Sequence, residues 1–66
     1  MQIFINDEPF ECSPQSTIAS LLREQNIQPL HLAVALNETV IPQAAWDQTE
    51  IPAGGRILII KAIQGG

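Results

Sequence analysis

The last residues of the chain carry its best candidate for chemistry, a free carboxylate on a slim tail. The sequence ends in Gln64, Gly65 and Gly66. Because glycine has no Cβ, the last two residues can enter a channel that would exclude any side chain. Three extended residues would carry the carboxylate roughly 10 Å beyond the last strand. Small residues also collect at chain ends without any function, so the tail alone leaves both interpretations open.

A free carboxylate is an anion at neutral pH and a poor electrophile, so it must be activated before it can transfer its acyl group. The simplest activation is a mixed anhydride with AMP, made by a partner enzyme that binds ATP. A sulfur nucleophile can then displace AMP and leave a thiocarboxylate. This chemistry would take place at Gly66, and it needs no cofactor bound to the chain itself.

Other reactive side chains are few. His31 is the single histidine and has no second ligand or base at a suitable spacing, so we expect it on a surface loop. Cys12 falls on an apolar strand face with no neighbouring cation, which favours a small buried hydrophobe over a nucleophile. The acidic residues Asp7, Glu8 and Glu11 are expected to be a solvated edge rather than a metal site. The sequence therefore predicts a protein that enzymes act on, not an enzyme.

Composition limits the class of protein further. The chain has 66 residues, a formal net charge of −4 and only three cationic side chains, which argues against nucleic acid as a partner. No apolar run approaches the roughly 20 residues of a membrane span. A single cysteine excludes an internal disulfide, and together with the absence of an export signal it favours the cytoplasm. We expect the free chain to be a monomer.

The apolar pattern predicts the order strand, strand, helix, strand, short strand, long strand. The helix is expected to begin after Ser16 or Thr17 and to end near Asn26. Its apolar stripe must lie on a sheet, because so short a helix is not stable alone. Trp46 is expected at the edge of the core with its indole N–H bonded to a carbonyl. The expected strands cover residues 1–6, 9–13, 32–36, 40–41 and 57–63, with tight turns expected at residues 6–8 and 37–39.

A hairpin followed by a crossover helix and later strands predicts a mixed sheet crossed by one helix. The two most apolar strands, 1–6 and 57–63, should be central and parallel. This is the β-grasp arrangement of the α+β class, with four or five strands in one domain over residues 1–66 and a flexible tail at 63–66. Gly54 and Gly55 should form the turn before the last strand, where φ is positive. The predicted core consists of Met1, Ile3, Ile5, Ile18, Leu21, Leu22, Trp46, Ile57 and Ile59.

Three large apolar residues are left over from this core. Phe4, Leu58 and Ile60 fall on the opposite face of the two central strands, beside Gln2 and Arg56. Scattered apolar residues are common on protein surfaces, and loops can cover them. An open sheet face, however, can only be hidden by another protein, which favours a partner-docking patch.

Several segments resemble the ThiS family, the sulfur carriers of thiamine biosynthesis, over essentially the whole length of the chain. The most specific is the spacing of Asn37, the Val40-Ile41-Pro42 run and Trp46, which is typical of ThiS proteins and not of ubiquitin. The ending, residues 62–66, matches the family tail, and the first four residues are similar to the first strand of ThiS and of ubiquitin. Two positions depart from the family pattern, namely Gln43 in place of arginine and Gly55 in place of aspartate.

The resemblance implies a β-grasp fold and a defined set of partners. A ThiF-like adenylyltransferase would use ATP to adenylate Gly66, and a cysteine desulfurase or another donor would supply sulfur. The thiocarboxylate would then give its sulfur to thiazole synthase, ThiG. Gln64 and Gly65 would form the slim tail. The docking face would contain Phe4, Leu58 and Ile60.

Two other functions remain open from the sequence. One is a sulfur carrier for another product, such as molybdopterin, although those carriers are usually longer. The other is a ubiquitin-like modifier or a binding module with no sulfur step, in which an activated glycine would be handed to a lysine amine. The segment from Asn37 to Trp46 is what distinguishes these alternatives from a ThiS protein.

Overall fold

The computed structural model describes residues 1–61, and its elements follow the predicted order. The second strand stops before Cys12, which was expected inside it, although Cys12 still donates its backbone N–H to the Met1 carbonyl at 2.9 Å. Residues 62 and 63 of the expected last strand lie outside the described part. The elements are β1 (Gln2–Ile5), β2 (Glu8–Glu11), α1 (Ile18–Glu24), β3 (Leu32–Leu36), β4 (Thr39–Ile41), the 3-10 helix η1 (Gln43–Ala45) and β5 (Arg56–Lys61).

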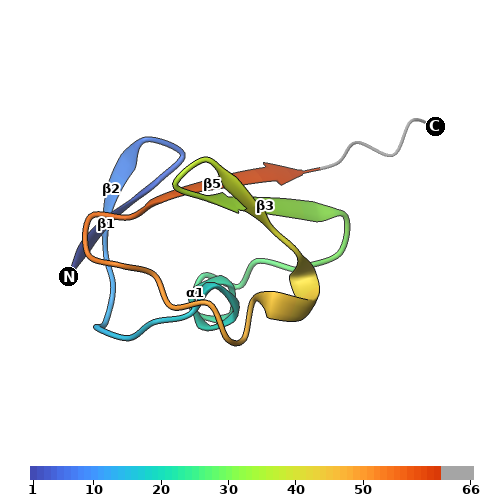
Figure 1. Cartoon of the computed structure of the whole chain (residues 1–66), viewed down its shortest axis with the longest axis horizontal. Coiled ribbons are helices and arrows are strands. Elements are labelled where there is room, and N and C mark those ends of the chain that lie inside the picture. Colours follow the sequence, from blue (N-terminus) through green and yellow to red (C-terminus); the bar gives the residue numbers. More distant parts are fainter. Residues whose placement is uncertain (62–66) are drawn as a thin grey trace.

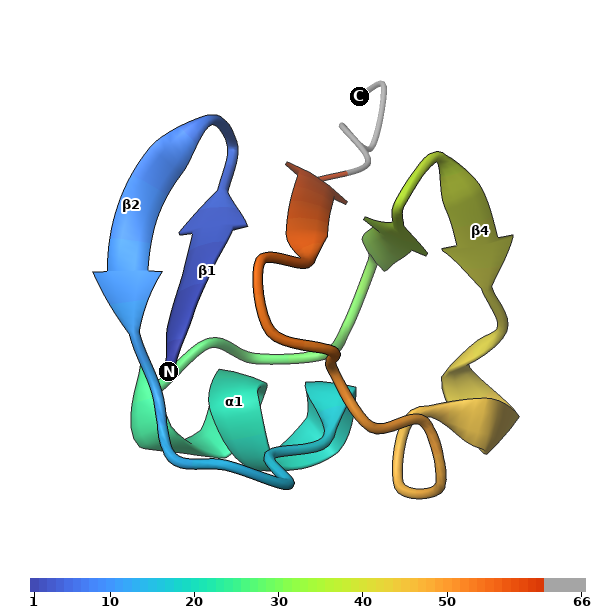
Figure 2. The same ribbon diagram turned by 60° about the vertical axis from the view of Figure 1, so that its left-hand side comes forward.

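Within residues 1–61 the strands form a five-stranded mixed sheet in the order β2-β1-β5-β3-β4. The central pair, β1 and β5, is parallel, with Phe4 opposite Arg56 and Ile5 opposite Ile57. The pairs β1–β2, β3–β5 and β3–β4 are antiparallel. Helix α1 lies across one face of this sheet (Figures 1 and 2). The expected β-grasp arrangement, with the first and last strands central and parallel, is therefore confirmed.

The core lies between the sheet and α1. Ile3, Val34 and Ile57 are each at most 2% exposed and face the helix, as strand alternation requires. Trp46 is 4% exposed, and its indole Nε1–H donates to the Ile41 carbonyl at 2.8 Å, as expected. The buried cluster consists of Ile3, Cys12, Ile18, Leu21, Leu22, Val34, Trp46, Ile51 and Ile57, with Met1 and Ile59 among the partly buried residues packed against it. The predicted core is thereby confirmed.

Helix α1 is held at both ends by the residues that its sequence suggests. The Thr17 Oγ1 accepts from the Ser20 N–H at 3.1 Å, and the Ser20 Oγ accepts from the Thr17 N–H at 2.9 Å. This reciprocal pair satisfies free donors of the first turn. Beyond the helix, Asn26 has a φ of 57°, the left-handed conformation that ends helices. Because the helix has only seven residues, packing on the sheet must supply most of its stability.

The two glycines before β5 serve different purposes. Gly54 has a φ of 76°, the positive value expected for the turn. Gly55, which was expected to share that role, is instead required by space, because a Cβ there would lie 2.9 Å from the Pro52 carbonyl oxygen and 3.1 Å from the Ile51 Cγ2. Its own carbonyl accepts from the Phe4 N–H at 2.9 Å and so starts the pairing of β1 with the segment leading into β5.

Replacement of Gly55 by alanine is therefore expected to destabilise the fold by about 2 kcal/mol, the usual cost of overpacking against backbone. The matched control is Gly54→Asn, because asparagine tolerates the left-handed conformation and nothing lies within 4 Å of that Cβ position. This control should cost less than the alanine at Gly55, about 1 kcal/mol or less, because asparagine carries a small strain at positive φ. Urea unfolding followed by Trp46 fluorescence measures both, and equal effects would show that steric space at Gly55 is not the cause.

Candidate docking face and tail base

The face of the sheet turned away from α1 is largely apolar. Successive side chains of a strand point to opposite faces, so the neighbours of buried Ile3, Val34 and Ile57 point away from the core. We call this surface the outer face, and its apolar members are Phe4, Ala33, Ala35, Val40, Leu58 and Ile60.

Strand register arranges these side chains in rows. Ala35 lies opposite Leu58 on one side and opposite Val40 on the other, while Ala33 lies opposite Ile60. The small alanines leave their larger neighbours exposed: Leu58 is 47%, Ile60 52% and Val40 69% exposed. Such adjacent apolar side chains on an open sheet face form a surface suited to a partner protein.

The structure brings together Leu58 and Ile60 on the outer face, exposed as expected, and places Phe4 at its margin. Phe4 is only partly buried, so it also keeps an accessible surface, and its register partner is Arg56. The binding role of all three stays a prediction. Sequence reasoning missed Val40 and the two alanines, because their place depends on the pairing of β3 with β4 and β5. The alternation from Val34 to Leu36 was the available signal.

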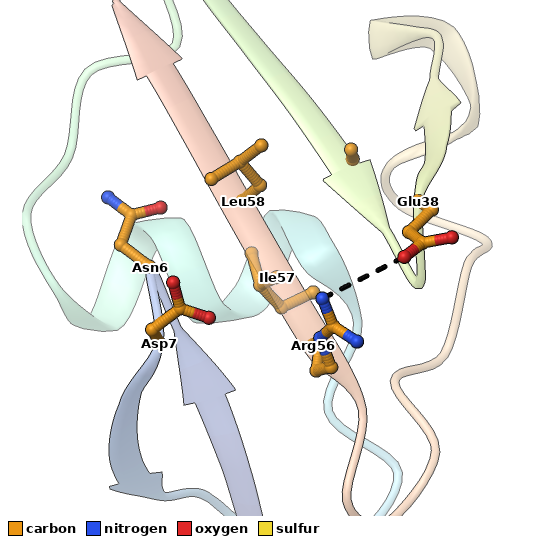
Figure 3. A pocket seen from close by; sticks show the side chains of 7 residues that line it. Asn6, Asp7, Glu38, Arg56, Ile57 and Leu58 are labelled. Atoms are coloured by element: carbon orange, nitrogen blue, oxygen red, sulfur yellow. Dashed lines mark ion pairs between the residues drawn. The ribbon is translucent and has the colours of Figure 1, made fainter.

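A pocket of about 190 Å³ lies at the polar end of the outer face (Figure 3). Asp7 from the β1–β2 turn and Glu38 from the β3–β4 turn border it on either side of β5. The Arg56 Nη2 lies 3.9 Å from the Glu38 Oε2, with both side chains more than half exposed, so this ion pair contributes little to stability. Charges of both signs therefore remain accessible beside the apolar rows.

The two turns that frame this pocket have the same backbone conformation. Asn6 and Asp7 have φ values of 50° and 70°, and Asn37 and Glu38 have values of 50° and 73°. Two consecutive residues with positive φ are typical of tight hairpin turns whose twist matches the strands, and asparagine is favoured at the first position. The expected turns after β1 and β3 are confirmed, although their third residues, Glu8 and Thr39, already belong to β2 and β4.

Both turn asparagines bind the backbone of β5 through their side chains. The Asn37 Oδ1 accepts from the Arg56 N–H at 2.9 Å, at the beginning of the strand. The Asn6 Oδ1 accepts from the Ile59 N–H at 2.9 Å, near its end. Sequence reasoning marked Asn37 as part of a family pattern and Asn6 as a turn residue, and it assigned neither a contact with β5.

The predicted tail lies beyond the described residues. Lys61 is the last described position and is paired with Leu32 on β3. The roles expected for Gln64, Gly65 and Gly66 therefore stay predictions. What the structure adds is their starting point, because β5 is a central strand held on one edge by β3 and on the other by β1 and Asn6.

The other reactive side chains lie where the sequence suggested. His31 is exposed, Cys12 is buried in the core, and Asp7, Glu8 and Glu11 are exposed around the first hairpin. Among residues 1–61, no three histidine, cysteine, aspartate or glutamate side chains are grouped in a way that could hold a metal ion. In the same part of the chain, none of the helices combines the length and the apolar character that a membrane crossing requires.

Comparison with known proteins extends these observations to the whole chain. The chain matches the model of the ThiS family over residues 3–66. It is 32% identical over 66 residues to the sulfur carrier protein ThiS of Escherichia coli strain K12, a match that covers all of both chains. It is also 30% identical to an uncharacterised protein, ycf40, of Porphyra purpurea, over all of this chain and 93% of that relative.

Solved structures show the same fold. A crystal structure of the thiamine biosynthesis protein ThiS from Geobacter metallireducens has a TM-score of 0.89 and 23% identity, and the match covers all of both chains. A solution structure of a thiamine biosynthesis protein from the same organism has a TM-score of 0.76 and 22% identity, over all of this chain and 88% of that one. Because the family model covers nearly the whole chain and a relative of the same length is 32% identical, the chain belongs to the ThiS family, the sulfur carriers of thiamine biosynthesis.

Proposed function

We propose that Gly66 is the residue at which this protein is activated, loaded with sulfur and unloaded. As a member of the ThiS family it is a sulfur carrier of thiamine biosynthesis and not a catalyst itself. A ThiF-like adenylyltransferase would supply ATP and the adenylation site, and a cysteine desulfurase or another donor would supply the sulfur. Thiazole synthase, ThiG, would receive it. All of these steps would take place in the cytoplasm.

The observation that carries the proposal is the extent of the family match. It runs to residue 66, so the Gly65-Gly66 ending lies within the matched region. The sulfur carrier of E. coli matches over all 66 residues as well. The described chain agrees with this role, because β5 is a central strand of the sheet and is the element that precedes the tail in the sequence.

The proposed chemistry has two steps at one carbonyl carbon. First, a carboxylate oxygen of Gly66 attacks the α-phosphate of ATP, and pyrophosphate leaves. Second, a hydrosulfide-level nucleophile attacks the carbonyl carbon and forms a C–S bond, while the C–O bond to AMP breaks and AMP leaves with its electron pair. The product is a thiocarboxylate. Where the sulfur arrives as the persulfide of a desulfurase, a thiol must first reduce it to hydrosulfide, and the thiol is oxidised to a disulfide in that step. The chain contributes a tail that is long and narrow enough to enter the partner's site, and the partner contributes the catalytic groups.

The outer face is proposed as the surface on which the adenylyltransferase docks. Leu58 and Ile60 lie on β5 itself, so a partner that covers them also fixes the strand from which the tail starts. Phe4 extends the same surface over β1. Burying a large apolar side chain is worth about 1.5–3 kcal/mol, so a few such residues can supply most of the energy of a transient complex.

Intact-mass measurement tests the proposed function directly. The purified chain is incubated with ATP, the ThiF-like adenylyltransferase of the same organism, a cysteine desulfurase with cysteine, and a thiol that reduces the desulfurase persulfide. We expect the mass to rise by the difference between one sulfur and one oxygen atom, and fragmentation should place this change at Gly66. Omission of ATP should prevent it.

An unchanged mass with a partner that is active on another ThiS protein would contradict the proposal. Appearance of the chain in amide linkage to lysine side chains, without any sulfur-containing form, would support the ubiquitin-like modifier instead. Transfer of sulfur from the loaded chain to ThiG then distinguishes thiamine biosynthesis from another sulfur pathway.

A further inference from the structure

We propose that Asn6 is a positioning residue for the tail, because its side chain holds the last part of β5 where the neighbouring strand has already turned away. The proposal rests on the proposed function in taking Gly66 as the reacting group. Its structural half, the contact between Asn6 and β5, can be tested without any reaction. It assigns a part in presenting the reactive end to a turn residue that is not one of the apolar members of the outer face.

The need for such a contact follows from the topology. In the described chain, β1 lies beside β5 at only two register positions, Phe4 with Arg56 and Ile5 with Ile57. The Asn6 N–H still donates to the Ile57 carbonyl at 2.8 Å, and then the chain turns into β2. Strand β5 continues for four more residues to Lys61. Beyond Ile57, the β1 edge of β5 has therefore lost its neighbouring strand.

The Asn6 side chain takes the place of the missing strand residue. Its Oδ1 accepts from the Ile59 N–H at 2.9 Å, and its Nδ2 lies 3.4 Å from the Ile59 carbonyl oxygen. An amide side chain can offer one acceptor and one donor in the same way as a peptide group. Asn6 thus extends the ladder by one position, to a point only two residues before the end of the described strand.

On the opposite edge, β3 pairs with β5 as far as Lys61. With Asn6 in place, β5 is held on both edges up to Ile59. Without the Asn6 side chain, the part of β5 after Ile57 would be paired with β3 alone. The end of the strand would then sample a wider range of directions. Each partner would then have to order the strand end on binding, which weakens productive binding without changing the chemical step.

Asparagine suits this position for two independent reasons. Its φ of 50° lies in the left-handed region, which glycine, asparagine and aspartate adopt at low cost. Glycine would satisfy the turn and remove the contact with Ile59, which separates the two roles experimentally. Asn37 provides a matched control within the chain, because it has the same φ and bonds to β5 at Arg56, at the far end from the tail.

The first experiment measures amide hydrogen exchange of the whole chain by NMR, with global stability measured by urea unfolding. Asn6→Gly should raise the exchange rate of the Ile59 amide by about tenfold, the change expected for loss of one hydrogen bond, after correction for global stability. Asn6→Asp keeps the acceptor and should retain most of the protection. Asn37→Gly should leave the Ile59 amide as in the unsubstituted chain.

The second experiment measures ATP–pyrophosphate exchange with the ThiF-like adenylyltransferase of the same organism, using each variant as the protein substrate. Asn6→Gly should raise KM by about five-fold and leave kcat unchanged, because the lost order affects binding and not the chemical step. Asn6→Asp should have a KM close to that of the unsubstituted chain. Asn37→Gly should leave KM unchanged.

Each outcome bears on a separate statement. An unchanged exchange rate of the Ile59 amide in Asn6→Gly would contradict the contact between Asn6 and β5. A faster exchange rate together with an unchanged KM would contradict the positioning role. An equal rise of KM in Asn37→Gly would also overturn it, because general loss of order in β5 would then be the cause. If the unsubstituted chain is not adenylated at all, the proposed function fails, while the exchange data still decide whether Asn6 holds β5.

Discussion

Removal of Gly66 is expected to abolish adenylation and sulfur loading and to leave the folded structure unchanged. The described core and sheet are formed by residues 1–61, so we expect that neither of them needs the last glycine. A shortened chain would present the carboxylate of Gly65 one residue, or about 3.5 Å, short of the position that the partner's site requires. A misplacement of about 1 Å can already cost a hundredfold in rate.

The measurement pairs intact mass after sulfur loading with the free energy of unfolding in urea. Gly66→Ala is the matched variant, because it keeps the length of the tail and adds only a Cβ. We expect the Gly66→Ala variant to load slowly, because the added Cβ hinders entry into the partner's site. The shortened chain should not load at all, because its carboxylate does not reach that site. Loading of the shortened chain at the rate of the full chain would contradict the role of Gly66, and loss of its fold would show that the tail is structural.

The second large effect is expected at the centre of the outer face. Leu58→Asp should lower kcat/KM for adenylation by about a hundredfold or more, because it removes an apolar contact and places a carboxylate in a surface that the partner desolvates. Leu58 is 47% exposed and is absent from the core cluster of the described chain. Its replacement should therefore lower the free energy of unfolding by only about 1 kcal/mol, the cost of aspartate in a strand, and leave the chain folded.

Gln48→Asp is the control for the added charge. Gln48 is exposed in the turn after η1, and this turn is bonded to the start of α1 through the Ile18 N–H and the Thr49 carbonyl, so the same carboxylate there should leave adenylation unchanged. The comparison uses ATP–pyrophosphate exchange over a range of protein concentrations. Full adenylation of Leu58→Asp would place the docking surface elsewhere, and equal losses in both variants would point to net charge rather than to the outer face.

Much of this fold could be predicted because its patterns are local. The alternation of Ile3 and Ile5, the helical spacing of Ile18 and Leu22, and turn residues at each junction all agree with one arrangement. The exposed positions of Leu58 and Ile60 followed from the same alternation. These predictions needed only the period of a strand or a helix and the fact that one helix covers one face of a sheet.

Features that depend on register could not be predicted in the same way. Ala35 and Val40 join Leu58 in one row because β3 pairs with β5 and β4 at particular positions, which no local pattern of the chain specifies. The contact of Asn6 with Ile59 spans 53 residues of sequence. Gly55 was assigned to the turn for its flexibility, whereas the carbonyl of Pro52 leaves no space for a side chain there.

The central position of β5 has a consequence for how the molecule is made. Among residues 1–61, the hairpins β1–β2 and β3–β4 are joined in the sheet only through β5, which follows both of them along the chain. While the ribosome is still synthesising the earlier segments, each hairpin can form but the sheet between them stays open, and such late long-range closure slows folding. A nascent chain therefore completes its core only when the last described strand has emerged. Interrupted synthesis would then yield fragments that quality-control proteases can remove before any of them competes for the activating enzyme.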